Sequence, residues 1–243
     1  MQKEPALGFV QSIQSLGTLD GPGIRFVAFL QGCPLRCGCC HNPDTWEMAG
    51  GTPYTPEALF AEAEHYRPYF GRDGGVTLSG GEPLMQAAFG EAFFRLARAS
   101  GISTCLDTSG CLLNEEIKAL LAFTDRVLLD IKYPTDALYR KYVGCSIDAP
   151  LTFLSYLAER GVKVTLRSVI IPTLTDTEIH EDLLRKITAT YACIDTVELL
   201  PFRKLCTVKY ERLGIPFRFA DIPEPTAAAV EAMRERVAAA IQK

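Results

Sequence analysis

Apolar, β-branched runs alternate with helical patterns along most of this chain. The apolar runs, which predict strands, are Ile24–Leu30, Val76–Leu78, Ile102–Leu106, Val127–Ile131, Val162–Ile171 and Val197–Leu200. The predicted helices are Pro56–Tyr66, Gln86–Ser100, Glu115–Ala122, Leu151–Arg160, Thr177–Tyr191 and Pro225–Ile241. Strands that alternate with helices predict βαβ units on a parallel sheet. Six such units predict an α/β fold, a partial (β/α)6 TIM-like barrel with parallel strands inside and helices outside.

The pattern runs without interruption from one end of the chain to the other. No linker rich in Gly, Ser or Pro is long enough to separate domains, and 243 residues can bury one large core. We therefore expect residues 1–243 to form a single domain.

A loop with four cysteines follows the first predicted strand. Cys33, Cys37 and Cys40 form a CxxxCxxC pattern. A [4Fe–4S] cluster is normally held by four thiolates, so a loop that supplies three leaves one iron with an open position for chemistry. A structural zinc site is the alternative, with His41 as the fourth ligand of a Cys3His set.

Composition and charge exclude several classes of function. The net charge of −4 gives no support to nucleic acid or an anionic membrane as a partner. No apolar run approaches the ~20 residues that a membrane helix needs, and the N-terminus lacks the features of a signal peptide. Nine cysteines in such a chain indicate a reducing cytoplasm and a metal rather than disulfides.

Polar residues end the predicted strands. They are Ser79-Gly80-Gly81-Glu82-Pro83 after the second strand, Asp107-Thr108-Ser109-Gly110 after the third, Asp130-Ile131-Lys132 after the fourth, Arg167 within the fifth and Arg203 after the sixth. In parallel α/β barrels the site is built at the C-terminal ends of the strands, so we expect these groups to converge near the cysteine loop.

Each of these residues also has a structural interpretation. Gly80-Gly81 can be a tight turn, or it can let a ligand approach the backbone. Asp107 can cap a helix. Asp130 and Lys132, on the same side of their strand, can form a buried ion pair, and Arg167 can be a paired structural residue.

Together these segments resemble the radical S-adenosylmethionine (SAM) enzymes, over almost the whole chain until about Glu211. The segment Asp20-Gly21-Pro22-Gly23-Ile24-Arg25 before the loop and His41-Asn42-Pro43 after it are similar to the activases of glycyl radical enzymes. Many activases insert a ferredoxin-like domain with eight further cysteines after the loop. Its absence from this sequence favours the short pyruvate formate-lyase type.

The resemblance implies a reaction. A [4Fe–4S] cluster on Cys33, Cys37 and Cys40 reductively cleaves SAM to methionine and a 5′-deoxyadenosyl radical, which takes a hydrogen atom from a backbone glycine of the partner. That partner is expected to be pyruvate formate-lyase, and the electron donor a flavodoxin or a ferredoxin. Two alternatives stay open: an activase of another glycyl radical enzyme, such as an anaerobic ribonucleotide reductase or a dehydratase, and a non-catalytic zinc-stabilised barrel.

The resemblance also assigns binding residues, with no catalytic side chain beyond the cluster and SAM. Asp20, in a turn-rich segment on the near side of the cysteine loop, contacts the partner's glycine loop. A monovalent cation is expected near Asp107, Thr108 and Asp130, because oxygen ligands suit a hard ion. The expected cofactor-binding set is Cys39, Cys40, His41, Gly80, Gly81, Glu82, Asp107, Asp130, Ile131, Lys132, Arg167 and Arg203.

Two residues depart from the family pattern. Cys39 stands where an aromatic residue usually packs against adenine, and because it adjoins Cys40 we interpret it as a non-ligand. Arg203 stands where a His is frequent; it keeps a donor but has no titratable proton at neutral pH. The remaining cysteines, interpreted as small buried hydrophobes, are Cys105, Cys111, Cys145, Cys193 and Cys206.

Overall fold

The computed structural model describes residues 7–239, and the chain divides into two compact units. The first unit comprises residues up to 34, 45–108 and 112–128; the second comprises residues 35–44, 109–111 and those from 129 onward. Each unit is built from several stretches of the chain. The expectation of a single domain stays a prediction.

The first unit contains a mostly parallel sheet with one antiparallel edge. Its strands are β1 (Gly8–Gly17), β2 (Arg25–Leu30), β3 (Thr52–Tyr54), β4 (Gly75–Gly80), β5 (Ser103–Thr108) and the start of β6 (Arg126–Asp130). They follow the order β3-β1-β2-β4-β5-β6. Strands β2, β4 and β5 are parallel, whereas β1 pairs antiparallel with both β2 and β3.

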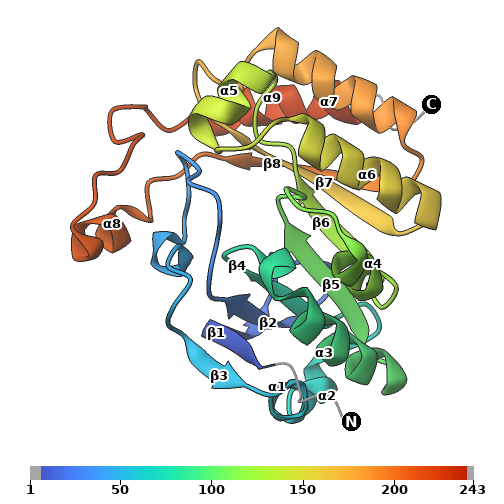
Figure 1. Cartoon of the computed structure of the whole chain (residues 1–243). Coiled ribbons are helices and arrows are strands. Elements are labelled where there is room, and N and C mark those ends of the chain that lie inside the picture. The colour runs from blue at the N-terminus through green and yellow to red at the C-terminus, as the bar shows by residue number, and fades with distance from the viewer. Residues whose placement is uncertain (1–6, 240–243) are drawn as a thin grey trace. The chain divides into compact units, whose positions relative to one another are not determined.

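Helices cover this sheet and complete the core of the first unit. They are α1 (Pro56–Glu64), α2 (Arg67–Phe70), α3 (Ala87–Ala99) and α4 (Glu115–Leu121), with a short 3-10 turn at Pro83–Gln86. A second 3-10 turn, Pro43–Thr45, begins in the second unit and ends in the first. Helix α3 packs between α1 and α4 (Figure 1). It approaches β4 and α4 closely at Gly90, where a Cβ would lie 3.1 Å from Leu78 and 3.3 Å from Leu120. Phe89, Phe93 and Phe94 fill the core from this helix.

The second unit contains the end of β6 with β7 (Lys163–Ile170) and β8 (Ile194–Pro201), of which β7 and β8 are parallel. Its helices are α5 (Asp136–Tyr142), α6 (Asp148–Arg160), α7 (Glu178–Thr190), α8 (Thr207–Leu213) and α9 (Ala227–Ala238). Helices α6, α7 and α9 cover β7 and β8 on one side (Figure 1). Helix α9 buries Val230, Met233 and Val237, and Arg234 donates a hydrogen bond to the Leu199 carbonyl.

The predicted α/β class is confirmed. All six predicted strands are present, as are the six predicted helices within a few residues of their expected bounds. The last helix was expected to reach Ile241, but residues 240 and 241 lie outside the described residues. The antiparallel strands β1 and β3 and the short helices α2, α5 and α8 were not predicted. Of the five remaining cysteines, Cys105 and Cys206 are buried and three are half-buried.

Within residues 7–239, no helix is long and apolar enough to cross a membrane.

Candidate functional site

The first part of the cysteine loop is fixed to the first unit by backbone hydrogen bonds. Strand β2 ends at Leu30, and Gly32, with φ +95°, turns the chain toward Cys33. Its N–H donates to the Thr45 carbonyl at 2.9 Å, and its carbonyl accepts from the Glu82 N–H at 2.9 Å. Cys33 is half-buried, so its thiol remains partly accessible.

The Gly80-Gly81 pair lies against the backbone that leads into this loop. A Cβ on Gly80, whose φ is +106°, would collide with the Leu30 nitrogen, and a Cβ on Gly81 would collide with the Gly32 carbonyl oxygen. The Gly81 N–H donates to the Leu30 carbonyl at 2.9 Å. Both glycines are therefore needed for close packing of the chain, whether or not a ligand also approaches them.

Gly81→Ala should destabilise the protein far more than Gly101→Ala. The Gly81 Cβ would meet fixed backbone, which we expect to cost about 3 kcal/mol of unfolding free energy. Gly101, with φ +72° and no atom within 4 Å of a Cβ, should lose only about 1 kcal/mol from backbone strain. Urea unfolding of both apo-proteins measures the difference, and equal losses would contradict the packing argument.

Four polar side chains gather at the C-terminal ends of β4 and β5. Ser79 donates a hydrogen bond to an Asp107 carboxylate oxygen at 2.7 Å, and Thr108 donates to Glu82 Oε1 at 2.6 Å. Glu82 is almost fully buried, and the same oxygen accepts from the Leu84 N–H at the start of a 3-10 turn. Glu82 and Asp107 are thus held in defined orientations at the edge where a parallel sheet carries its site.

The second part of the cysteine loop is held within the second unit. The N–H groups of Arg36 and Gly38 donate to the carbonyls of Val143 and Tyr142 at 3.0 and 2.8 Å, at the end of α5. The Cys40 N–H donates to the Cys37 carbonyl at 3.2 Å, which closes the turn between two expected ligands. This turn therefore has a defined backbone conformation.

Helix α8 supports the same turn. Tyr210 is buried, and its hydroxyl donates to the Cys40 carbonyl at 3.1 Å. Lys209 donates to Asn42 and Asp44, at 2.9 and 3.1 Å. These supports were not predicted, because a seven-residue helix carries too short a pattern to reveal its position.

Cys39 differs from its neighbours. It is buried, whereas Cys37 and Cys40 are half-buried. Burial raises the pKa of the Cys39 thiol to about 11, so it stays protonated at neutral pH. A protonated, enclosed thiol suits packing better than metal binding.

Three charged side chains meet in the second unit around Asp130. Lys132 Nζ lies 2.7 Å from one carboxylate oxygen of Asp130, and Arg167 Nε lies 3.3 Å from the other. The Ile131 N–H donates to the Arg167 carbonyl at 2.8 Å, and the Lys132 N–H donates to the Tyr139 hydroxyl at 2.8 Å. The predicted pairing of Asp130 with Lys132 is therefore present, with Arg167 as a further partner.

Asp130 and Lys132 both stay ionised in this group. Burial opposes ionisation of Asp130, but Lys132 and Arg167 outweigh it and lower the pKa of Asp130 below its usual value. Burial also opposes the charge on Lys132, yet Asp130, and then Cys37, raise the pKa of Lys132 well above its usual value. The group therefore offers two cationic side chains, which form strong hydrogen bonds with carboxylates.

His41 and Arg203 meet through the Arg203 backbone. His41 Nε2 lies 3.0 Å from the Arg203 carbonyl oxygen. The Arg203 guanidinium pairs with Glu224 at 2.8 Å, and Glu224 also accepts from the Lys204 N–H. Arg203 therefore fastens the segment after β8, and its binding of a cofactor stays a prediction.

Asp20 lies at the opposite end of β2 from the cysteine loop. It precedes Arg25, the first residue of β2, whereas Cys33 follows Leu30, the last one. Six strand residues, about 20 Å, separate the two positions. The expectation that the Asp20 segment lies on the near side of the loop is therefore wrong, because chain proximity was mistaken for spatial proximity across a strand. A partner segment that contacted Asp20 would have to extend along β2 to bring its glycine to the cysteine loop.

The cysteine residues have the chemistry that an iron–sulfur cluster requires. Among residues 7–239, no three His, Cys, Asp or Glu side chains form the close set that one bound ion needs. Cys33, Cys37 and Cys40 are partly accessible, and the turn between Cys37 and Cys40 is closed by a hydrogen bond. Thiolates are the usual ligands of iron–sulfur clusters, so this donor set fits one.

Residues 27–185 match the Radical SAM superfamily. The crystal structure of Streptococcus suis SuiB bound to S-adenosylmethionine shares the fold with a TM-score of 0.68 and 15% identity, covering 86% of this chain and 45% of that one. The fold and the match to this superfamily define a radical SAM enzyme. Membership of the superfamily implies a [4Fe–4S] cluster and SAM as cofactors.

Two relatives show to which group of radical SAM enzymes the chain belongs. The chain is 44% identical to the pyruvate formate-lyase-activating enzyme of Clostridium pasteurianum, covering 89% of this chain and 91% of that protein. It is 38% identical to the pyruvate formate-lyase 1-activating enzyme of Escherichia coli K12, covering 94% of each. The chain belongs to the family of pyruvate formate-lyase-activating enzymes, which removes the alternative of a non-catalytic zinc-stabilised barrel.

Proposed function

We propose that this protein activates pyruvate formate-lyase under anaerobic conditions by forming a glycyl radical on its backbone. The observation that carries the proposal is the buried group of Asp130, Lys132 and Arg167. Its two cationic side chains suit the carboxylate of SAM, and Lys132 lies close enough to Cys37 for a thiolate there to raise the pKa of Lys132. When bound, the reduced cluster on Cys33, Cys37 and Cys40 supplies the electron that splits the S–C5′ bond of SAM.

The protein's own residues bind SAM and keep the cluster ligands in a fixed orientation. Lys132 and Arg167 hold a carboxylate while Asp130 keeps both cations in place. Tyr210 holds the backbone at Cys40, so that the ligand turn stays in one conformation. Cys39 remains a thiol and fills space beside that turn. Each contact pre-organises the site before SAM arrives.

Further assignments of this proposal rest on the resemblance. The resemblance implies a monovalent cation with oxygen ligands, of the kind that Asp107 and Thr108 carry. The electron donor is a flavodoxin or a ferredoxin, and the protein works in the cytoplasm. Gly80, Gly81, Glu82, Ile131, His41 and Arg203 complete the cofactor-binding set.

The deciding experiment is anaerobic incubation of the reduced protein with SAM and pyruvate formate-lyase, followed by electron paramagnetic resonance. We expect a glycyl radical on pyruvate formate-lyase. Parallel samples contain an anaerobic ribonucleotide reductase or a glycyl radical dehydratase. A radical on one of these, with none on pyruvate formate-lyase, would replace the proposed partner.

Asp20→Asn should separate partner activation from SAM cleavage. The amide retains the turn chemistry of the segment but removes the charge that accepts hydrogen bonds from the partner's glycine loop. We expect unchanged iron content and unchanged SAM cleavage without partner, and a clear loss of glycyl radical. Wild-type activation rates at partner concentrations below saturation would remove Asp20 from the partner site.

A further inference from the structure

Arg25, the first residue of β2, is a buried cation whose hydrogen-bonding capacity is fully used. Its side chain has no solvent exposure. Guanidinium carries five N–H donors, and Arg25 has five acceptors: Thr77 Oγ1 at 2.6 Å and the carbonyls of Pro22, Asp73, Val76 and Ser103 at 3.1, 3.4, 2.7 and 3.1 Å. A buried charge is costly unless its donors are satisfied, and here all five are.

Two of these five contacts lead to the segment that carries Asp20. Arg25 Nη1 donates directly to the Pro22 carbonyl. Arg25 Nε donates to the Thr77 hydroxyl, which in turn donates its own proton to the Asp20 carbonyl at 2.8 Å. A hydroxyl has one proton to give, so the direction of this relay is fixed.

The segment lies directly on the Arg25 side chain because it contains two glycines. A Cβ on Gly21, whose φ is +124°, would lie 2.8 Å from Arg25 Cδ. A Cβ on Gly23, whose φ is +69°, would lie 2.5 Å from the Gly74 nitrogen. Side chains at either position would push the segment away from its anchor.

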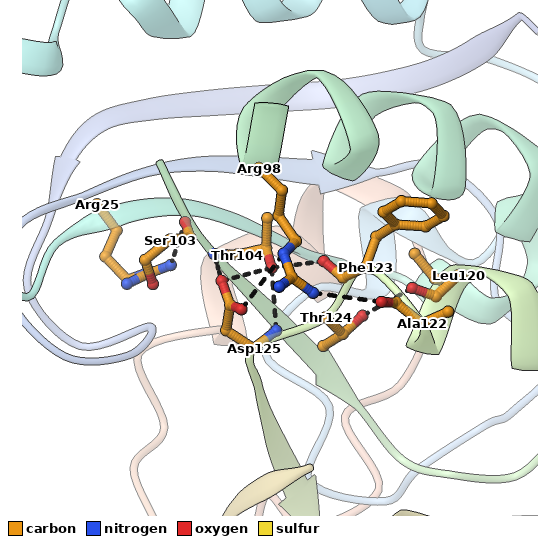
Figure 2. A network of polar contacts seen from close by, with 9 residues as sticks. All are labelled: Arg25, Arg98, Ser103, Thr104, Leu120, Ala122, Phe123, Thr124 and Asp125. Atoms are coloured by element: carbon orange, nitrogen blue, oxygen red, sulfur yellow. Dashed lines mark hydrogen bonds and ion pairs between the residues drawn. The ribbon is translucent and has the colours of Figure 1, made fainter. Parts of the chain in front are cut away.

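The other three contacts join Arg25 to the starts of the neighbouring strands. Asp73 precedes β4, Val76 is its second residue, and Ser103 begins β5; Figure 2 shows the Arg25 guanidinium at the Ser103 carbonyl. Arg25 thus links the Asp20 segment to three parallel strands of the first unit. These strands are paired with one another by backbone hydrogen bonds.

We propose that Arg25 and Thr77 are positioning residues that hold Asp20 at the place where the partner's glycine segment binds. This inference rests on the proposed function. Neither residue needs to touch the partner. Their role is to keep residues 20–23 in one conformation before binding, so that the partner does not bear the cost of ordering them.

Thr77→Val tests the relay because it removes the hydroxyl and nearly conserves the volume. We expect the KM for pyruvate formate-lyase to rise roughly three- to tenfold, while kcat at saturation and SAM cleavage without partner stay near wild type. Hydrogen exchange of the amides of residues 18–24 should become faster. Thr77→Ser keeps the hydroxyl and should restore both readouts.

Thr104→Val is the matched control. Thr104 is equally buried in the neighbouring strand β5, but its hydroxyl donates to the Phe123 carbonyl at 2.7 Å and accepts from the Asp125 N–H at 3.0 Å (Figure 2). Its loss should lower Tm about as much as Thr77→Val does, yet leave the KM and the exchange of residues 18–24 unchanged.

The outcomes are distinct. A folded Thr77→Val protein with wild-type KM and wild-type exchange overturns the inference, as does a Thr104→Val protein whose KM rises equally. Failure of the wild-type protein to form any radical on pyruvate formate-lyase refutes the proposed function instead. In that case hydrogen exchange still decides whether Thr77 orders the segment.

Discussion

Alanine in place of Cys33, Cys37 or Cys40 should reduce bound iron to background and abolish SAM cleavage. The loop has only three expected ligands, since its fourth cysteine, Cys39, is a buried thiol, so the two remaining thiolates cannot hold the cluster firmly. The expected loss of activity is complete. Iron and sulfide content after anaerobic reconstitution, together with the brown absorbance of the cluster, measure the effect.

Cys39→Ala is the control for these three variants. It removes a thiol from the same loop, but that thiol is buried and its pKa is raised to about 11. We expect full iron content and SAM cleavage within a few-fold of wild type. Loss of iron as complete as in Cys40→Ala would show that the ligand assignment is wrong.

Asp130→Ala and Lys132→Ala should each retain the cluster and lose SAM cleavage by more than tenfold. Loss of a hydrogen bond to a charged group typically costs about 1.5–3 kcal/mol. Without Asp130, moreover, Lys132 and Arg167 lose the buried carboxylate that lies between them. Equilibrium binding of SAM and its reductive cleavage, measured on protein with verified iron content, test both variants.

Arg140→Ala provides the comparison in the same unit. Arg140 pairs with Asp136 at 2.6 Å, but both side chains are well exposed, at 65% and 43%. Exposed pairs contribute less than about 1 kcal/mol, so SAM binding should not change. Normal SAM cleavage in both the Asp130 and the Lys132 variants would show that their pair is structural only.

The parts of the fold that the sequence predicts are those with continuous apolar runs. A buried strand such as β2 is apolar at almost every position, and helices of thirteen residues show a full period. Strand β1 escaped detection because it is exposed along one side and carries polar residues such as Gln11 and Gln14. Its role as a strand depends on pairing with β2, which no local pattern contains.

In the candidate site, too, contacts between residues close in sequence could be predicted, whereas contacts between distant residues could not. The pairing of Asp130 with Lys132 follows from their i, i+2 spacing at the end of an extended strand. The contacts of Arg167 with Asp130, of Tyr210 with Cys40 and of Thr77 with Asp20 join residues 37, 170 and 57 positions apart. Such contacts depend on how strands and helices pack together. The residue types involved are common, so no sequence motif indicates these contacts.

The anchor at Arg25 has a consequence for the conditions under which the protein can work. All five acceptors of its guanidinium are uncharged oxygens, and the group is shielded from solvent. Dissolved ions weaken exposed ion pairs but have little effect on buried contacts with neutral partners. Arginine also keeps its proton at every physiological pH. The contacts that fasten the segment carrying Asp20 to Arg25 are thus insensitive to ionic strength and acidity.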